Sequence, residues 1–143
     1  MYSREDINEY NKHQQFDQAL EKFSGSRSFN KQTGNIGEAI AEKILKDKGY
    51  KIITVNYTNK IGEIDIIAQQ KDTIVFVEVK MRASLGRGTP REAVNTFKQR
   101  KIRQVAEAFL KSKRMLDVGC RFDCIEIVGS ADKHTIEHLE GCF

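Results

Sequence analysis

Three charged residues interrupt two apolar segments of the chain: Asp65 within GEIDIIA (62–68), and Glu78 and Lys80 within TIVFVEVK (73–80). Both segments are rich in β-branched residues, which predicts strands. Because alternate side chains of a strand lie on the same face, Glu78 and Lys80 share a face. A short polar link predicts that the two strands form a hairpin, so Asp65 can approach both residues. Unpaired charges in so apolar a setting are costly, and they require a compensating partner.

A divalent cation is one such partner. Carboxylate oxygens suit Mg²⁺, or Mn²⁺, and one or two carboxylates commonly hold the ion while water and phosphate oxygens complete its shell. Asp65 and Glu78 are therefore candidate metal ligands, and Lys80 would orient an attacking water or stabilise charge on a phosphate. The alternative is a structural ion pair of Lys80 with Asp65 or Glu78. Spacing alone leaves both interpretations open.

Positive charge is concentrated in one part of the chain. The net charge is +4, yet residues 80–114 hold eleven Lys and Arg residues and only two acids, Glu92 and Glu107. Such a region attracts polyanions, and Lys and Arg contacts to phosphate supply most non-specific nucleic-acid affinity. The alternative is an ordinary solvated helix face. The candidate nucleic-acid-binding residues are Arg82, Arg87, Lys98, Gln99, Arg100, Lys101 and Arg103, of which Gln99 or Lys101 could approach the scissile phosphate.

The elements that position these residues follow from hydrophobic spacing. Ile36, Ile40 and Ile44 predict the buried face of an amphipathic helix over 33–48, which ends at Gly49. A capping-box pattern with Pro90 in its second position predicts a second helix from Thr89 to about Lys113. Strands are expected at 50–57, 62–68, 73–80, 121–128 and 135–139.

The resulting order, α-β-β-β-α-β-β, predicts an α/β sandwich with a mixed sheet of about five strands flanked by helices. The chain has 143 residues, which suits one domain. Residues 1–30 are expected to be a polar N-terminal appendage, helical or disordered, and residues 31–143 the folded domain.

Several segments together resemble a known family. The matching segments are GEAIA (37–41), NY (56–57), GEIDIIA (62–68), VFVEVK (75–80) and RFD (121–123). Asp65 followed by Glu78-Val79-Lys80 is similar to the core of the PD-(D/E)xK nuclease superfamily. The stretch from Gly34 onward resembles the YraN family of small bacterial proteins, which are related in fold to archaeal Holliday-junction resolvases.

This resemblance implies a restriction-endonuclease-like domain with a catalytic site at Asp65, Glu78 and Lys80, and a metal at the two acids. Ile64 stands where the superfamily has a proline, a departure that is usual within this family. Glu38 matches the helical acidic residue of resolvase-like members, and the helical geometry places it at the rim of the apolar arc. Its alternative role is a favourable interaction with the helix dipole.

The remaining residues with reactive side chains are expected to be structural. Cys120, Cys124 and Cys142 have no zinc-type spacing and are expected to be reduced thiols, with a disulfide or catalytic thiol as the alternative. His13, His134 and His138 are expected at the surface. Arg121 and Asp123 share a strand face, which favours a salt bridge. An apolar leader or membrane span is absent from the sequence pattern, and the expected location is the cytoplasm.

Three functions are consistent with these patterns. The first is an Mg²⁺-dependent endonuclease that hydrolyses DNA phosphodiester bonds, on branched or damaged DNA. The second is a catalytically silent nucleic-acid-binding module, and the third is a scaffold of a DNA-processing complex. The expected partner is DNA, contacted through its backbone with a preference for structure over sequence. A homodimer and a DNA-repair or recombination protein remain open as further partners.

Overall fold

A computed structural model describes residues 36–82 and 95–143 of the chain. The described elements follow the predicted order, α-β-β-β-α-β-β, and the predicted fold class is confirmed. Helices and strands are α3 (Ile36–Asp47), β1 (Lys51–Thr58), β2 (Glu63–Gln70), β3 (Thr73–Arg82), α5 (Thr96–Ser112), β4 (Gly119–Gly129) and β5 (His134–Leu139).

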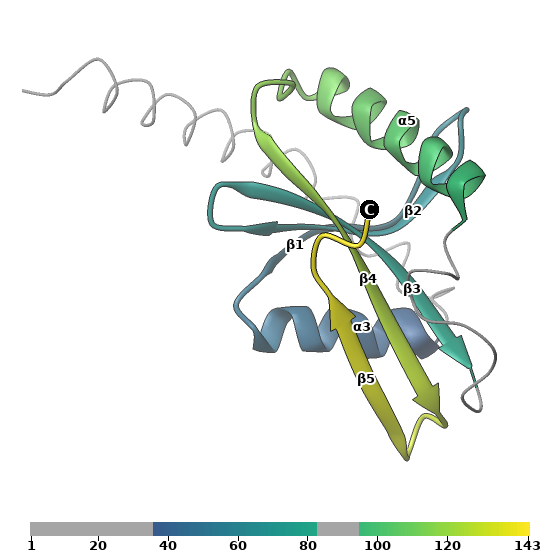
Figure 1. Cartoon of the computed structure of the whole chain (residues 1–143). Coiled ribbons are helices and arrows are strands. Elements are labelled where there is room, and N and C mark those ends of the chain that lie inside the picture. Colours follow the sequence, from purple (N-terminus) through teal and green to yellow (C-terminus); the bar gives the residue numbers. More distant parts are fainter. Residues whose placement is uncertain (1–35, 83–94) are drawn as a thin grey trace, which may run out of the picture.

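The five strands form one open sheet in the order β1-β2-β3-β4-β5 (Figure 1). The pairs β1–β2, β2–β3 and β4–β5 are antiparallel, whereas β3 and β4 are parallel. A parallel pair needs a crossover connection, and α5 lies within the stretch that links β3 to β4. The predicted hairpin of β2 and β3 is confirmed, and Lys71 in its turn has a left-handed backbone, φ 52°.

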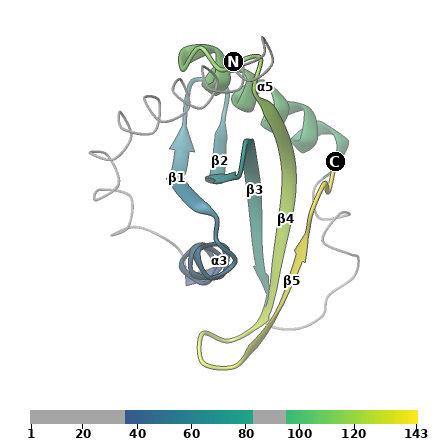
Figure 2. The same ribbon diagram turned by 90° about the vertical axis from the view of Figure 1, so that its left-hand side faces the viewer.

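The two helices lie on opposite faces of the sheet, as Figures 1 and 2 show. On one face α5 packs through Ile102, Val105 and Phe109 against strand residues that include Phe76. On the other face α3 packs through Ala41 and Leu45 against residues that include Val77. The sheet is therefore buried on both sides, and its alternating side chains contribute to two separate cores.

The expected buried face of α3 is wrong by one position. Gly37, Ala41 and Leu45 are the buried residues of the helix, whereas Ile36 is 58% exposed. The small side chains of Gly37 and Ala41 allow the helix to lie close to the sheet. The helix ends as predicted at Gly49, which has φ 90° and donates its N–H to the Lys46 carbonyl.

The expected start of the second helix is also wrong. α5 begins at Thr96, and Asn95 is its N-cap, with an extended backbone and a side chain that accepts a hydrogen bond from the Lys98 N–H. An extended residue at 95 excludes one continuous helix from Thr89 to Lys113. The capping-box residues 89–92 and Arg87 lie outside the described residues, as do the appendage at 1–30 and His13.

In the described part of the chain, no helix combines the length and the apolar character needed to cross a membrane.

Candidate acidic site

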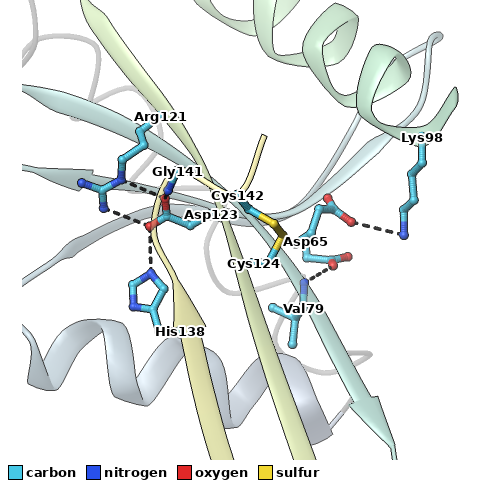
Figure 3. The surroundings of a disulfide bond; sticks show 10 residues. Asp65, Val79, Lys98, Arg121, Asp123, Cys124, His138, Gly141 and Cys142 are labelled. Atoms are coloured by element: carbon cyan, nitrogen blue, oxygen red, sulfur yellow. Dashed lines mark hydrogen bonds and ion pairs between the residues drawn. A yellow bond between two sulfur atoms is a disulfide. The ribbon is translucent and has the colours of Figure 1, made fainter. Parts of the chain in front are cut away.

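Asp65 and Glu78 lie where β2 and β3 separate. Pairing of the two strands runs from the turn to Ile66 and Val77 and does not include Asp65. Beyond this pair the Asp65 carboxylate replaces backbone pairing, because its Oδ2 accepts a hydrogen bond from the Val79 N–H at 2.8 Å (Figure 3). We call this point of separation the strand fork. The predicted approach of Asp65 to β3 takes place there, through the hydrogen bond to Val79. We call Asp65 and Glu78 the acidic pair.

Glu78 is the more deeply buried and less well satisfied member of the acidic pair. It is 7% exposed, and its Oε2 lies 3.5 Å from the ammonium of Lys98 on α5. Its other oxygen, Oε1, is buried with no hydrogen-bond partner. Burial and the neighbouring charge of Asp65 raise the pKa of Glu78 to about 8. Burial also raises the pKa of Asp65, against the opposing effects of the Val79 N–H and Lys98.

Glu38 approaches the acidic pair from α3, on the other face of the sheet from Lys98. Burial and then the charge of Asp65 raise the pKa of Glu38, while a hydrogen bond with the Asn56 side chain lowers it. Asn56 lies on β1 between the residues paired with Ile64 and Ile66, and its backbone is left-handed, φ 52°. Asparagine tolerates this conformation better than most residues. Sequence reasoning gave Asn56 no role, although its position beside Tyr57 matched a family segment.

Lys80 does not contact the acidic pair in the structure. Its side chain is exposed, and among the described residues no ion pair joins it to Asp65 or Glu78. The cation beside Glu78 is instead Lys98 of α5. The approach of Gln99 or Lys101 to a scissile phosphate stays a prediction. Lys80 follows Glu78 by two residues, which is about 6.6 Å along β3. It therefore lies on the same face of the strand as Glu78, but farther beyond the fork.

The expected nucleic-acid-binding residues that the structure describes lie on α5 and at the end of β3. Lys98, Arg100, Lys101 and Arg103 are exposed on α5, and Gln99 is partly buried. Arg82 forms an ion pair with the buried Glu126 of β4, which draws it away from solvent. Arg103 lies over the rings of Phe122 and Phe143, with 4.9 Å and 5.7 Å to their centroids. Their contacts to DNA stay a prediction.

A second buried acid lies on β4. Asp123 is fully buried and accepts two hydrogen bonds from Arg121, at 2.8 and 2.9 Å, so the predicted salt bridge is confirmed. It also pairs with His138 Nε2 at 2.8 Å and accepts the Gly141 N–H at 3.0 Å (Figure 3). The expected surface position of His138 is wrong, because its side chain is only 3% exposed. We call Asp123, Arg121, His138 and Gly141 the Asp123 cluster.

The expectation that the cysteines are reduced is also wrong for two of them. Cys124 and Cys142 form a disulfide, and Cys120 is a free, exposed cysteine. The β4–β5 hairpin brings the C-terminal residues back along β4, where the Cys142 N–H donates to the Phe122 carbonyl at 2.7 Å. Cys124 follows Asp123 along β4 and is the register partner of Glu78 on β3. The disulfide therefore lies between the acidic pair and the Asp123 cluster.

The acidic pair has the donor set of a magnesium or manganese site. Across residues 36–82 and 95–143, no three His, Cys, Asp or Glu side chains form a complete metal cage. Mg²⁺ commonly needs only one or two carboxylates, because water and phosphate oxygens fill its other positions. The unpartnered Glu78 Oε1 is a free ligand atom, and the mutual repulsion of the acids would be relieved by a cation. Asp65 and Glu78 fit such an ion.

The fold and the acidic pair define a mixed α/β protein with a carboxylate site at a strand fork. The sequence pattern of Uncharacterised protein family UPF0102 matches residues 37–127, and the chain belongs to this family. The matched range contains Glu38, Asp65, Glu78 and Lys80. The resemblance to the YraN family is thereby confirmed.

Relatives in this family match most of the chain. A UPF0102 protein of Alkaliphilus oremlandii is 51% identical over 116 residues, which cover 80% of this chain and 99% of the relative. A UPF0102 protein of Acetivibrio thermocellus is 47% identical over 104 residues, covering 72% and 80% of the two chains. A UPF0102 protein of Clostridium tetani is 46% identical over 118 residues, covering 81% and 97%.

Proposed function

We propose that this protein is a metal-dependent endonuclease that hydrolyses DNA phosphodiester bonds, with branched or damaged DNA as its substrate. The observation that carries the proposal is the acidic pair: two adjoining carboxylates at a strand fork, one with a buried oxygen that has no partner. A purely structural pair of acids would be expected to have its oxygens satisfied, because leaving a buried polar atom unpaired costs about 1–3 kcal/mol. At the acidic pair, Glu78 Oε1 is left unpaired in this way, which is expected if a ligand binds there.

Asp65 and Glu78 would hold Mg²⁺ or Mn²⁺. When bound, such an ion polarises a phosphodiester and lowers the pKa of a coordinated water. Glu38 adds negative charge from the opposite face, which strengthens the attraction for a cation. The Val79 N–H fixes the orientation of the Asp65 carboxylate, so that one ligand is held in place before the metal binds.

Two lysines are available to the phosphate. Lys98 has a half-exposed side chain beside Glu78, and Lys80 is exposed on the same strand as Glu78. Either ammonium can stabilise negative charge that develops on the phosphate, and Lys80 can orient the attacking water. Exposed Arg100, Lys101 and Arg103 extend the positive surface along α5 and would contact the DNA backbone without reading sequence. DNA as the substrate implies action in the bacterial cytoplasm.

The direct test is a cleavage assay with linear, nicked and four-way-junction DNA, with and without Mg²⁺ or Mn²⁺. We expect metal-dependent cutting by the wild type, loss of cutting in Asp65→Asn, and unchanged cutting in the matched control Glu137→Gln, an exposed acid of β5. Lys80→Ala should lower the cleavage rate by about 10²–10³-fold, the range for removal of a charge-stabilising donor. If no substrate is cut with either metal, the catalytically silent binding module replaces this proposal.

A metal-binding measurement tests the metal site at the acidic pair independently of DNA cleavage. At a metal concentration of about 100 times Kd, a ligand that binds only the folded state raises stability by about 2.7 kcal/mol. Mg²⁺ or Mn²⁺ should therefore raise the melting temperature of the wild type and of Glu137→Gln, but not of Asp65→Asn. An equal rise in Asp65→Asn would contradict the assignment of the metal site.

A further inference from the structure

The first turn of α5 presents an aromatic ring to solvent. Phe97 is 73% exposed, more than any other large hydrophobic residue among the described ones; the others are Ile36 at 58%, Leu116 at 59% and Ile61 at 38%. Burial of a phenylalanine normally contributes about 1.5–3 kcal/mol to folding. α5 buries Ile102, Val105 and Phe109, so the helix has a complete core-facing side without Phe97. The ring is available for another contact.

Phe97 immediately precedes the lysine that forms an ion pair with the acidic pair. The next residue, Lys98, reaches Glu78 at 3.5 Å. Lys101, one helical turn later, places its ammonium over the Phe97 ring, 5.5 Å from the centroid. The Lys101 side chain also lies near Gly62, the residue before β2. The exposed ring therefore lies in the same turn of α5 as Lys98, which reaches Glu78, with the Lys101 ammonium over it.

The charges around Phe97 favour a nucleic acid over an apolar protein partner. From Thr96 to Arg103 the helix carries Lys98, Arg100, Lys101 and Arg103 and no acid. The helix dipole opposes a cation in the first turn, so Lys98 does not serve helix stability there. A ring surrounded by cations is the combination used to bind single strands, where the cations follow the phosphates and bases stack on the aromatic side chain.

We infer that Phe97 is a stacking platform for an unpaired base, and that it makes the protein select DNA with unpaired bases next to a duplex. This inference rests on the proposed function, whose substrate it narrows to forked, branched or gapped DNA. Lys101 lies over the ring and binds the adjoining phosphate, while the base occupies the exposed part of Phe97. A fully paired duplex offers no free base, so it gains nothing from the ring.

The test measures binding in EDTA, where cleavage and metal affinity do not contribute. Forked DNA, single-stranded DNA and a fully paired duplex are titrated by fluorescence anisotropy, and a 2-aminopurine at the fork reports stacking by its quenching. Base–aromatic stacking predicts that Phe97→Ala weakens binding of forked and single-stranded DNA by about 5- to 100-fold and removes the quenching. Binding of the duplex should change less than about twofold, and Phe97→Trp should restore both signals. Leu116→Ala, which truncates another exposed apolar residue, is the matched control and should leave all three affinities unchanged.

The inference is overturned if Phe97→Ala weakens all three DNAs equally or weakens none. It is also overturned if the variant changes only the sedimentation of the protein, since Phe97 then belongs to a protein interface. Failure of the proposed nuclease function gives a different result from failure of this inference. In that case the wild type cuts nothing with Mg²⁺ or Mn²⁺, while the selective loss in Phe97→Ala persists.

Discussion

The acidic pair and the Asp123 cluster lie on adjacent strands of one sheet and differ in how their charge is balanced. Asp123 accepts hydrogen bonds from Arg121, His138 and the Gly141 N–H, whereas Glu78 has a half-exposed lysine, one backbone hydrogen bond from Asp65 and an oxygen with no partner. Burial alone would raise the pKa of Asp123, but His138 and Arg121 outweigh burial and lower it. The pKa of Glu78 is raised to about 8. The charge of Asp123 is balanced within the protein, whereas that of the acidic pair is not, as the proposed metal site requires.

The largest expected difference between the two regions is in folding stability. Asp123→Ala should lower the free energy of unfolding by about 3–5 kcal/mol, the cost of breaking a buried ion pair from one side. Arg121 would lose a bidentate partner, and the buried His138 would lose its acceptor. Urea denaturation measures the effect, and Asp132→Ala, at an exposed acid, is the control. If the variant does not fold, Asp123→Asn keeps the shape and should show a smaller loss. A change below about 1 kcal/mol in both variants would contradict the structural role.

The second prediction concerns the disulfide that lies between the two regions. Cys124 and Cys142 close a loop with a sequence separation of 18 residues. The chain-entropy relation gives about 3 kcal/mol for a loop of this size. Cys142→Ser should lower stability by about that amount and loosen the tail that supplies the Gly141 N–H to Asp123. Cys120→Ser, at the exposed free cysteine, is the control. Dithiothreitol should shift the melting temperature of the wild type toward that of Cys142→Ser, and a wild type insensitive to it would contradict this prediction.

The third prediction is a gain of folding stability, whereas the first two are losses. Without metal, Glu78→Gln should raise the free energy of unfolding at pH 7, by on the order of 1–3 kcal/mol, because the wild-type Glu78 must take up a proton on folding, whereas glutamine is neutral in both states. Glu137→Gln is the matched control, and chemical denaturation in EDTA is the measurement. With Mg²⁺ present, the advantage should shrink, since the wild type then gains the binding energy of the ion. A loss of stability in EDTA would show that Glu78 is a structural acid.

The same variant tests the pH dependence. Glu78 has an ordinary pKa of 4.5 and a folded-state pKa of about 8, so between these values the folded protein binds the extra proton. Stability of the metal-free wild type should therefore fall as pH rises from about 5 to 8, and Glu78→Gln should remove that decline. Asp123 acts in the opposite direction. Its pKa is lowered from 3.8, so its contribution is present above that value and is lost as the pH falls through the lower folded-state pKa.

The two regions were also unequally predictable from the sequence. Asp65 and Glu78 were singled out because they are charged residues within apolar, β-branched segments. Burying a charge without a partner is unfavourable, so such residues are candidates for binding a ligand. The strands themselves followed from the same segments, and the observed bounds differ from the expected ones by at most two residues. The Arg121–Asp123 pair followed from alternation along a single strand. Local patterns were sufficient wherever partners lie on one strand or one hairpin with a short turn.

Contacts that depend on register across longer connections were not predictable. His138 meets Asp123 only because of the pairing of β4 with β5, and Cys142 reaches Cys124 only after the chain has turned back. The buried face of α3 depended on the close approach that Gly37 and Ala41 permit, which hydrophobic spacing does not encode. Lys98, which reaches Glu78, lies in the first turn of α5, because the helix begins at Thr96, later than the capping pattern indicated. Asn95 itself was an available N-cap signal, because asparagine is among the residues preferred at that position.

The smallest expected effect concerns Lys98, the cation that the structure places beside the acidic pair. Its side chain is 53% exposed, so the ion pair with Glu78 should contribute less than about 1 kcal/mol to stability. Its effect on proton binding should be clearer, because the charge of Lys98 lowers the pKa of both Glu78 and Asp65. In Lys98→Gln the pKa of Glu78 should therefore rise further, as measured by carboxyl ¹³C NMR titration without metal. Lys111→Gln, at an exposed position in the last turn of α5, should leave that titration unchanged. If Lys98→Gln also leaves it unchanged, the lysine does not balance the acidic pair, and the contrast with the Asp123 cluster becomes larger still.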